Sequence, residues 1–412
     1  MRLTGHRSSL LLALLCSVVL LAGCGKSAPS ASSGASATGG PLSRQLAPVA
    51  RQGAVSVTTR NTTRLGGADP TADAAAVARA VYPALTPATR PATVVLADER
   101  NWPVALAATS LASAPLGAPL LLTEGNSLPE VSANTLEALG PLGAPALGGA
   151  QVLLVGNAAP LPKSYLAQTV ASGQAAPEAA ASIEQVLRRL SGRAPRQVIV
   201  LAAESTPALA MPAAGLAAES GAPILYVTQA QVPAATASVL KGLGHPAIYV
   251  IDPAQVGATT LAALRKLGTV TEIAGGGEAS SAAANAVDVA RFADTQFGWG
   301  VKEPGHGLVF ANATRPLDAV AAAPLSATGD YGPLLLLESA TQIPPPLATY
   351  LADIQPAYTP AFNFRPVRGV YNHGWLIGDE SAIAAVTQAE LDTLLEISPR
   401  KQSSEPSVTP VE

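Results

Sequence analysis

Arginine and aromatic side chains gather in one stretch of this chain, residues 365–375, where they could contact a sugar or a phosphate. The stretch holds Arg365, Arg368, Tyr371, His373 and Trp375, although aromatic residues make up only 4% of the chain. Arginine pairs with phosphates and carboxylates and stacks on aromatic rings. A hairpin-like insert that covers the edge of a sheet is the alternative. Arg365, Arg368 and Trp375 are therefore candidate ligand-binding residues.

A carboxylate, Asp318, stands at the start of an alanine-rich segment, three residues after Arg315. It could pair with Arg315 or cap a helix. It could also bind a sugar hydroxyl, because open α/β sheets bind ligands at the carboxyl ends of their strands. Arg315 and Asp318 are candidate ligand-binding residues on this interpretation.

The turn from Gly66 to Asp69 suggests an anion contact. Its glycines allow close approach of the backbone, and amide groups at a helix start attract anions, so the turn could cradle a phosphate. The alternative is a helix start with Asp69 as the N-cap and Pro70 at the first helical position. Asp69 and the preceding Arg64 join the candidate ligand-binding residues.

Catalytic and metal-binding chemistry has little support in the sequence. Beyond the first 23 residues the histidines are His245, His306 and His373, which lie far apart, whereas metal ligands usually recur at short spacings. There is no Gly-x-Ser-x-Gly motif, although a triad assembles in space and spacing alone does not exclude one. We predict a protein that is not an enzyme and that needs no metal and no cofactor.

Composition limits the classes of partner. Apolar residues make up 48% of the chain and charged residues 13%, which supplies a buried core and argues against global disorder. The formal net charge is −3, so no basic field favours nucleic acid.

The N-terminus has the pattern of an export signal. Arg2 and Arg7 precede an apolar run over residues 10–21, which is too short to span a bilayer. The tetrapeptide that ends at Cys24 resembles a lipobox, where a signal peptidase cuts before a lipid-bearing cysteine; a plain signal peptide with a chance cysteine is the alternative. We expect a lipoprotein with a signal peptide at 1–23 and an acyl chain such as palmitate on Cys24. Cys16 would be removed, which leaves no partner for an internal disulfide.

Two segments have the composition of unstructured chain. Residues 24–53 are rich in Ser, Ala, Gly and Pro, and we expect a flexible tether there. Residues 400–412 are polar, and we expect a disordered tail.

Between these segments the chain repeats itself three times, at a domain-sized period. Each copy has a first apolar run, an alanine-rich segment, a second apolar run that follows a proline, and a later third run. The first runs are 93–97, 197–202 and 307–311; the alanine-rich segments 104–113, 208–219 and 318–327; the second runs 117–123, 221–228 and 332–338; and the third runs 152–155, 247–251 and 374–378.

The repeated pattern predicts the fold class. The runs are apolar without alternation, which is typical of parallel strands buried on both faces. Strand, helix, strand, helix, strand predicts α/β units with right-handed crossovers. We therefore predict three tandem α/β units, with repeats at 54–170, 171–268 and 269–399, the third of which carries the arginine-aromatic stretch.

From residue 64 onward the sequence resembles the cell wall-binding repeat type 2 family. That family opens with an Arg-hydrophobic-x-Gly-x-Asp turn before an alanine-rich helix, which residues 64–69 and 74–78 match. It continues with a strand ending in Ala, an Asp-Ala-Leu-Ala-Ala segment and Gly-Ala-Pro-Ile-Leu-Leu-Thr, matched in order by residues 94–97, 104–108 and 117–123. A Ser-Leu-Pro turn follows at 127–129. Copies two and three are degenerate but in register.

The resemblance implies three Rossmann-like or Toprim-like units packed around a pseudo-threefold axis. The chain also departs from the family. The Asp before Ala-Leu is replaced by Val104 and Ala208 and is kept only at Asp318, while Glu272 stands where copy one has Arg64. Copy two has no recognisable opening turn.

Together these features predict a non-catalytic envelope protein that is anchored to the cell membrane by the lipid on Cys24 and faces the cell wall. Its three repeats would bind a cell-wall polymer, an anionic glycopolymer, through several weak sites. A lipid-anchored, extracytoplasmic solute-binding protein is the first alternative, and an envelope hydrolase is the second.

Overall fold

The structure, a computed structural model, describes residues 55–157, 159–273, 281–327, 331–360 and 364–399. The signal peptide, Cys24, the tether and the polar tail predicted from the sequence lie outside these residues. Within the described residues no helix has the length and apolar character needed to cross a bilayer.

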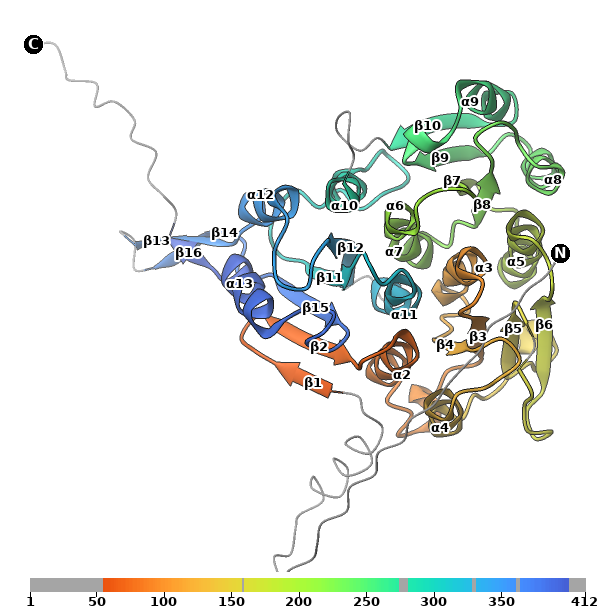
Figure 1. Ribbon diagram of the computed structural model, residues 1–412, viewed down its shortest axis with the longest axis horizontal. Coiled ribbons are helices and arrows are strands. Elements are labelled where there is room, and N and C mark those ends of the chain that lie inside the picture. The colour runs from red at the N-terminus through yellow and green to blue at the C-terminus, as the bar shows by residue number, and fades with distance from the viewer. Residues whose placement is uncertain (1–54, 158, 274–280, 328–330, 361–363, 400–412) are drawn as a thin grey trace, which may run out of the picture. The chain divides into compact units, whose positions relative to one another are not determined.

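Three mainly parallel sheets form the body, and they share one strand order (Figure 1). Sheet 1 runs β4 (Leu120–Thr123), β3 (Val94–Asp98), β5 (Val152–Val155), β6 (Ala167–Ala171). Sheet 2 runs β8 (Ile224–Val227), β7 (Gln197–Ala202), β9 (Ala247–Ile251), β10 (Thr269–Ile273). Sheet 3 runs β12 (Tyr331–Leu337), β11 (Gly307–Asn312), β15 (His373–Ile377), β2 (Thr62–Gly66), and ends with the antiparallel β1 (Val55–Thr58). The predicted parallel α/β architecture is confirmed.

Helices cover both faces of the sheets, as unalternating apolar strands require. Along β11, Val309 and Ala311 join the large central core, whereas Leu308 and Phe310 join a second cluster on the opposite face. The helices are α2 (Pro70–Val81), α3 (Trp102–Ala107), α4 (Glu130–Leu139), α5 (Ala176–Ser191), α6 (Pro207–Ala210), α7 (Pro212–Ser220), α8 (Ala234–Gly242), α9 (Ala258–Arg265), α10 (Ala282–Arg291), α11 (Leu317–Ser326), α12 (Pro345–Asp353) and α13 (Ala385–Leu395).

The helical segments between β3 and β4, between β7 and β8 and between β11 and β12 meet in the middle. These are the 3-10 segment η2 (Ala108–Ala112), α7 and α11, and each contacts the other two. Small side chains permit the close approach: a Cβ on Gly215 of α7 would lie 2.8 Å from Ser326 Oγ of α11. One hydrophobic core therefore runs through all three units. Such contacts are what pseudo-threefold packing would require, and the symmetry itself stays a prediction.

The strand that opens each sequence copy pairs with the sheet of another copy. β6 and β10 close sheets 1 and 2, and then lead into α5 and α10 of the next copy. β2, at the start of copy one, pairs with β15 of copy three, so the first copy completes the last sheet. Copy two carries no recognisable opening turn in its sequence, yet β6 and α5 occupy the place of an opening strand and helix. β6 is an edge strand with alternating exposure and no apolar run, which hid it from the sequence pattern.

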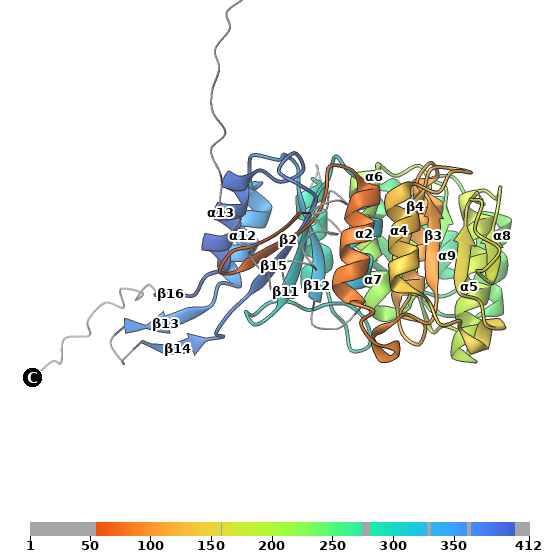
Figure 2. The same cartoon turned by 90° about the horizontal axis from the view of Figure 1, so that it is seen from below.

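The arginine-aromatic stretch begins in a hairpin. β13 (Ala357–Thr359) and β14 (Arg365–Arg368) are antiparallel, and β16 (Ser398–Pro399) joins β13. Figure 2 shows these strands extending away from the parallel sheets. The hairpin is present, but among the described residues its strands form a sheet of their own and pair with no edge of the large sheets, so the expected covering of a sheet edge is not seen.

Candidate functional site

Four of the predicted site residues lie near the carboxyl ends of the strands of sheet 3. Arg64 is in β2, Asp69 caps α2, and Arg315 and Asp318 follow β11. Arg64 and Arg315 both approach Gly378, at the end of β15: Arg64 donates to its carbonyl oxygen at 3.0 Å, and a Cβ on Gly378 would lie 3.4 Å from Arg315. The fold thus brings together residues that are up to 254 positions apart (318 − 64).

Arg315 bridges two buried carboxyl groups. Its guanidinium lies 2.5 Å from Asp73 Oδ2 and 2.8 Å from Asp318 Oδ2, and both aspartate side chains are fully buried. The contact with Asp318 has ion-pair distance without the alignment of a hydrogen bond. Asp73 also accepts a hydrogen bond of 2.7 Å from the Gly67 amide. One cation therefore serves two carboxyl groups that water does not reach.

The two carboxyl groups titrate as a pair that keeps a proton at neutral pH. Burial and the neighbouring Asp73 carboxylate raise the pKa of Asp318 to about 9. Burial raises the pKa of Asp73 to about 6, against the lowering effect of the Gly67 amide and of Arg315. The interaction between the two carboxyl groups raises the pKa of Asp318 and lowers that of Asp73, so they titrate as a coupled pair.

This pair predicts a pH dependence of stability. Both folded-state pKa values lie above the value of about 3.9 in an unfolded chain, so the folded protein binds more protons over the range from about 4 to 9. The free energy of unfolding contributed by the pair should therefore fall as pH rises through that range. Asp318→Asn mimics the protonated form and should flatten the fall, as measured by urea unfolding at pH 5, 7 and 9. Asp353→Asn, at an exposed ion pair, is the matched control; equal slopes in the native chain and Asp318→Asn would contradict the shared proton.

The opening turn is shaped around Asp73. Gly66 has φ +136°, and a Cβ there would collide with Asp73 Oδ1. The Gly67 amide is already bonded to that oxygen. Asp69 has extended backbone and accepts a hydrogen bond of 2.9 Å from the Ala72 amide, with Pro70 at the first helical position. The structure thus has the helix cap that was the alternative to a phosphate-cradling turn.

Arg64 acts as a clamp between the two ends of the described chain. It is 2% exposed and donates to the carbonyl oxygens of Gly378, Asp379 and Ile383 at 3.0, 2.7 and 2.6 Å, and to the Gln388 side chain. The hollow beside it, about 420 Å³, is also bordered by Asp379 and Glu380, whose charges disfavour an anion there. The N–H groups of Arg64 thus donate their hydrogen bonds to the protein itself.

The residues of the arginine-aromatic stretch divide into two places. Arg365 is exposed on β14, and Arg368 pairs with Glu303 at 2.7 Å. Trp375 is half-buried in sheet 3, where it pairs with Thr63 of β2. The hairpin and the loop after it expose large apolar side chains, namely Phe364, Val367, Val370 and Tyr371. This surface joins exposed cationic and apolar groups, but Trp375 is not part of it.

Sequence reasoning missed Asp73 as a partner of Arg315. A signal was present, because Asp73 lies four residues after Asp69 within an otherwise alanine-rich helix, on a buried face. Across the described ranges no group of three or more His, Cys, Asp or Glu side chains is placed to hold a metal ion.

Residues 64–166 match the family described as Cell wall binding domain 2 (CWB2). The match begins at Arg64, in the strand that completes sheet 3, and extends over most of sheet 1. A search of the curated proteins finds no match.

Two solved structures from Clostridium difficile share the fold. Cwp6 has 17% sequence identity and a TM-score of 0.63, with 83% of this chain and 51% of that chain covered. Cwp8 has 19% identity and a TM-score of 0.58, with 86% of this chain and 55% of that chain covered. The chain therefore spans about half the length of these proteins, and at such identities the similarity concerns the fold alone.

Proposed function

We propose that this chain is a non-catalytic envelope protein that binds an anionic glycopolymer of the cell wall and is held at the membrane by a lipid on Cys24. The observation that carries the proposal is the match to the cell wall binding domain family at residues 64–166, which contributes β2 to sheet 3 and three of the four strands of sheet 1. The domain supports an extracytoplasmic location, where such a polymer is found.

The proposed mechanism is avidity. Three similar units joined through one core present several surfaces to a repeating polymer at a fixed spacing. Each contact can be weak, since the second and third form within an already bound complex at a high effective concentration. A lipid at one end of the tether would keep the units close to the wall.

Sedimentation with purified cell walls tests this function. The soluble chain from residue 25 should co-sediment with intact walls and lose most of that binding after the walls are stripped of teichoic-type polymer. Bovine serum albumin at equal concentration is the control for trapping. Failure of the chain to bind any wall fraction would overturn the proposal.

The exposed hairpin carries two of the ligand-binding residues that were predicted from the sequence. Arg365→Ala together with Arg368→Ala should weaken wall binding about three- to tenfold, because two cations leave an exposed surface. Arg365 should account for most of the loss, since Glu303 already pairs with Arg368. Arg265→Ala, at an exposed ion pair elsewhere, is the matched control. Unchanged wall binding in the double variant would remove the hairpin from the binding surface.

A further inference from the structure

Arginines are concentrated where α5 leads into β7. Arg188, Arg189, Arg193 and Arg196 fall within nine positions of a chain that has 25 lysines and arginines in all and a formal net charge of −3. Arg188 pairs with the buried Glu184 at 2.9 Å. The other three are exposed, and in the part of the chain that the structure describes none of them has an acidic partner within ion-pair distance.

Helix electrostatics accounts for only part of this group. Cations in the last turn of a helix are favoured by its negative end, which explains Arg188 and Arg189. Arg193 and Arg196 lie beyond Gly192, the left-handed residue that ends α5. The helix dipole therefore does not account for the charges of Arg193 and Arg196.

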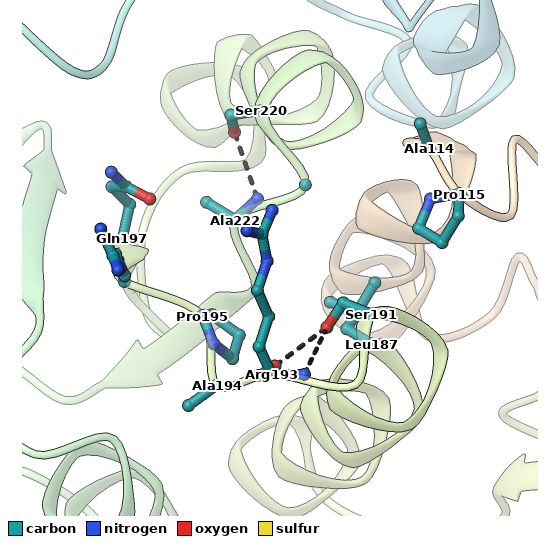
Figure 3. A pocket seen from close by; sticks show the side chains of 12 residues that line it. Ala114, Pro115, Leu187, Ser191, Arg193, Ala194, Pro195, Gln197, Ser220 and Ala222 are labelled. Carbon is teal, nitrogen blue, oxygen red and sulfur yellow. Dashed lines mark hydrogen bonds between the residues drawn. The ribbon is translucent and has the colours of Figure 1, made fainter.

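This segment borders two adjoining hollows. The first has a volume of about 370 Å³ and is bordered by Pro115, Ser191, Arg196 and Ser220, with Arg193 between them. The second, about 700 Å³, shares Arg193 with the first and reaches Arg188 and Arg189. In Figure 3 the Arg193 side chain extends from its backbone beside Ser191 toward the segment that carries Ser220 and Ala222. We call the two hollows together the arginine cleft.

Three helical segments end at or next to residues that line the same cleft. α5 ends at Ser191, α7 ends at Ser220, and η2 ends next to Ser113. The last carbonyl groups of a helix lack partners within that helix. Gly221, with φ +68°, brings the end of α7 against η2, since a Cβ there would lie 2.9 Å from Ser113 Oγ. Three helical segments thus end around one opening.

This mixture of groups selects a chemical class of ligand. Guanidinium groups bind phosphate through paired hydrogen bonds. The negative ends of helices disfavour a bare anion, but their carbonyl groups accept hydrogen bonds from hydroxyls. A ligand that carries both phosphate and hydroxyl groups satisfies both sets of partners, whereas a neutral polyol leaves the arginines unused.

We propose that the arginine cleft binds a phosphate-bearing glycopolymer, with Arg193 and Arg196 on the phosphate and the helix-end carbonyl groups on the hydroxyls. This inference rests on the proposed wall binding and names one of its sites. The cleft lies between the ends of elements from the first two copies, well away in sequence from the hairpin of the third.

Direct binding of a defined polymer tests the cleft. Poly(glycerol phosphate) is the probe and dextran of similar length the neutral comparison, with affinities measured by calorimetry at low salt. The Arg193→Ala and Arg196→Ala double variant should bind poly(glycerol phosphate) at least about tenfold more weakly. Arg265→Ala with Lys266→Ala removes the same charge from exposed positions outside the cleft in the same unit and should change affinity less than about twofold.

Each outcome of these measurements either supports or overturns binding at the arginine cleft. Equal affinity in the native chain and the cleft variant, preference for dextran, or binding to phosphatidylglycerol vesicles without binding to poly(glycerol phosphate) would overturn the cleft. Because both residues are exposed, the melting temperature should not change; if it falls, Arg193→Gln with Arg196→Gln gives the same comparison. Co-sedimentation with whole walls separates the two proposals. A cleft variant that binds poly(glycerol phosphate) like the native chain defeats the cleft alone, while a native chain that never sediments with walls defeats the wall-binding function.

Discussion

Replacement of Arg315 with methionine is expected to lower the free energy of unfolding by about 3–5 kcal/mol at neutral pH, the cost of breaking a buried ion pair from one side. The arginine lies between Asp73 and Asp318, both fully buried, and is the only cation within ion-pair distance of either among the residues the structure describes. One proton is shared, so one buried negative charge would lose its partner. Urea unfolding of the native and variant chains measures the difference.

The expected loss has a specific origin, so it should be reversible by design. Adding Asp73→Asn to Arg315→Met removes the stranded charge and should restore much of the stability at pH 7. The loss should also shrink at pH 5, where the carboxyl pair is more fully protonated. Arg265→Met, from a pair whose side chains are 54% and 35% exposed, should cost no more than about 1 kcal/mol. A loss that stays the same at both pH values would show that packing, and not the carboxyl pair, sets it.

Replacement of Arg64 with methionine is the second large effect. It would strand the carbonyl oxygens of Gly378, Asp379 and Ile383 in the interior, and each unsatisfied buried group costs about 1–3 kcal/mol. We expect a total loss of more than about 3 kcal/mol, with separation of α13 from sheet 3 as the first step of unfolding. Hydrogen exchange should then show faster exchange in residues 385–395 than elsewhere.

Arg60 supplies the matched control for Arg64. It too joins the first strands to the C-terminal part of the chain, through Glu396, but its side chain is 71% exposed. Arg60→Met should therefore cost no more than about 1 kcal/mol. If Arg64→Met kept its stability and lost only wall binding, Arg64 would be a ligand contact and not a clamp.

The elements of the fold follow closely from local sequence. The apolar runs predicted as strands at 152–155, 197–202 and 247–251 have the bounds of β5, β7 and β9. They were readable because strands buried on both faces need unbroken apolar side chains. β6 was not readable, since an edge strand with one exposed face carries no such run. The pattern of apolar residues identifies strands that are buried on both faces, and it misses strands that are partly exposed.

The candidate site was less predictable, because its meaning depends on contacts across the chain. A local pair of Arg315 and Asp318 was one of the alternatives that the sequence offered, but Asp73 is 242 positions away from Arg315 and enters only through the packing of α2 against α11. Arg64 was expected to meet a ligand, and nothing local reveals that its donors meet carbonyl groups beyond residue 377. The arginines of the cleft were not singled out from the sequence, because the hollows that they line are formed by segments distant in the chain.

The pairing of β2 with β15 has a consequence for the time course of synthesis. Thr63 is made 310 positions before His373, its neighbour in sheet 3. At the usual 5–20 residues per second, the first strands wait about 15–60 seconds for their partner. During that interval β2 presents an open edge that can pair with other chains. Sheets 1 and 2 can close as they emerge, but the third cannot, so a chain truncated before residue 373 would leave β2 paired with β1 on one edge and unpaired on the other. Holding the nascent chain apart from its neighbours until the last sheet closes is therefore a requirement that this topology places on the cell.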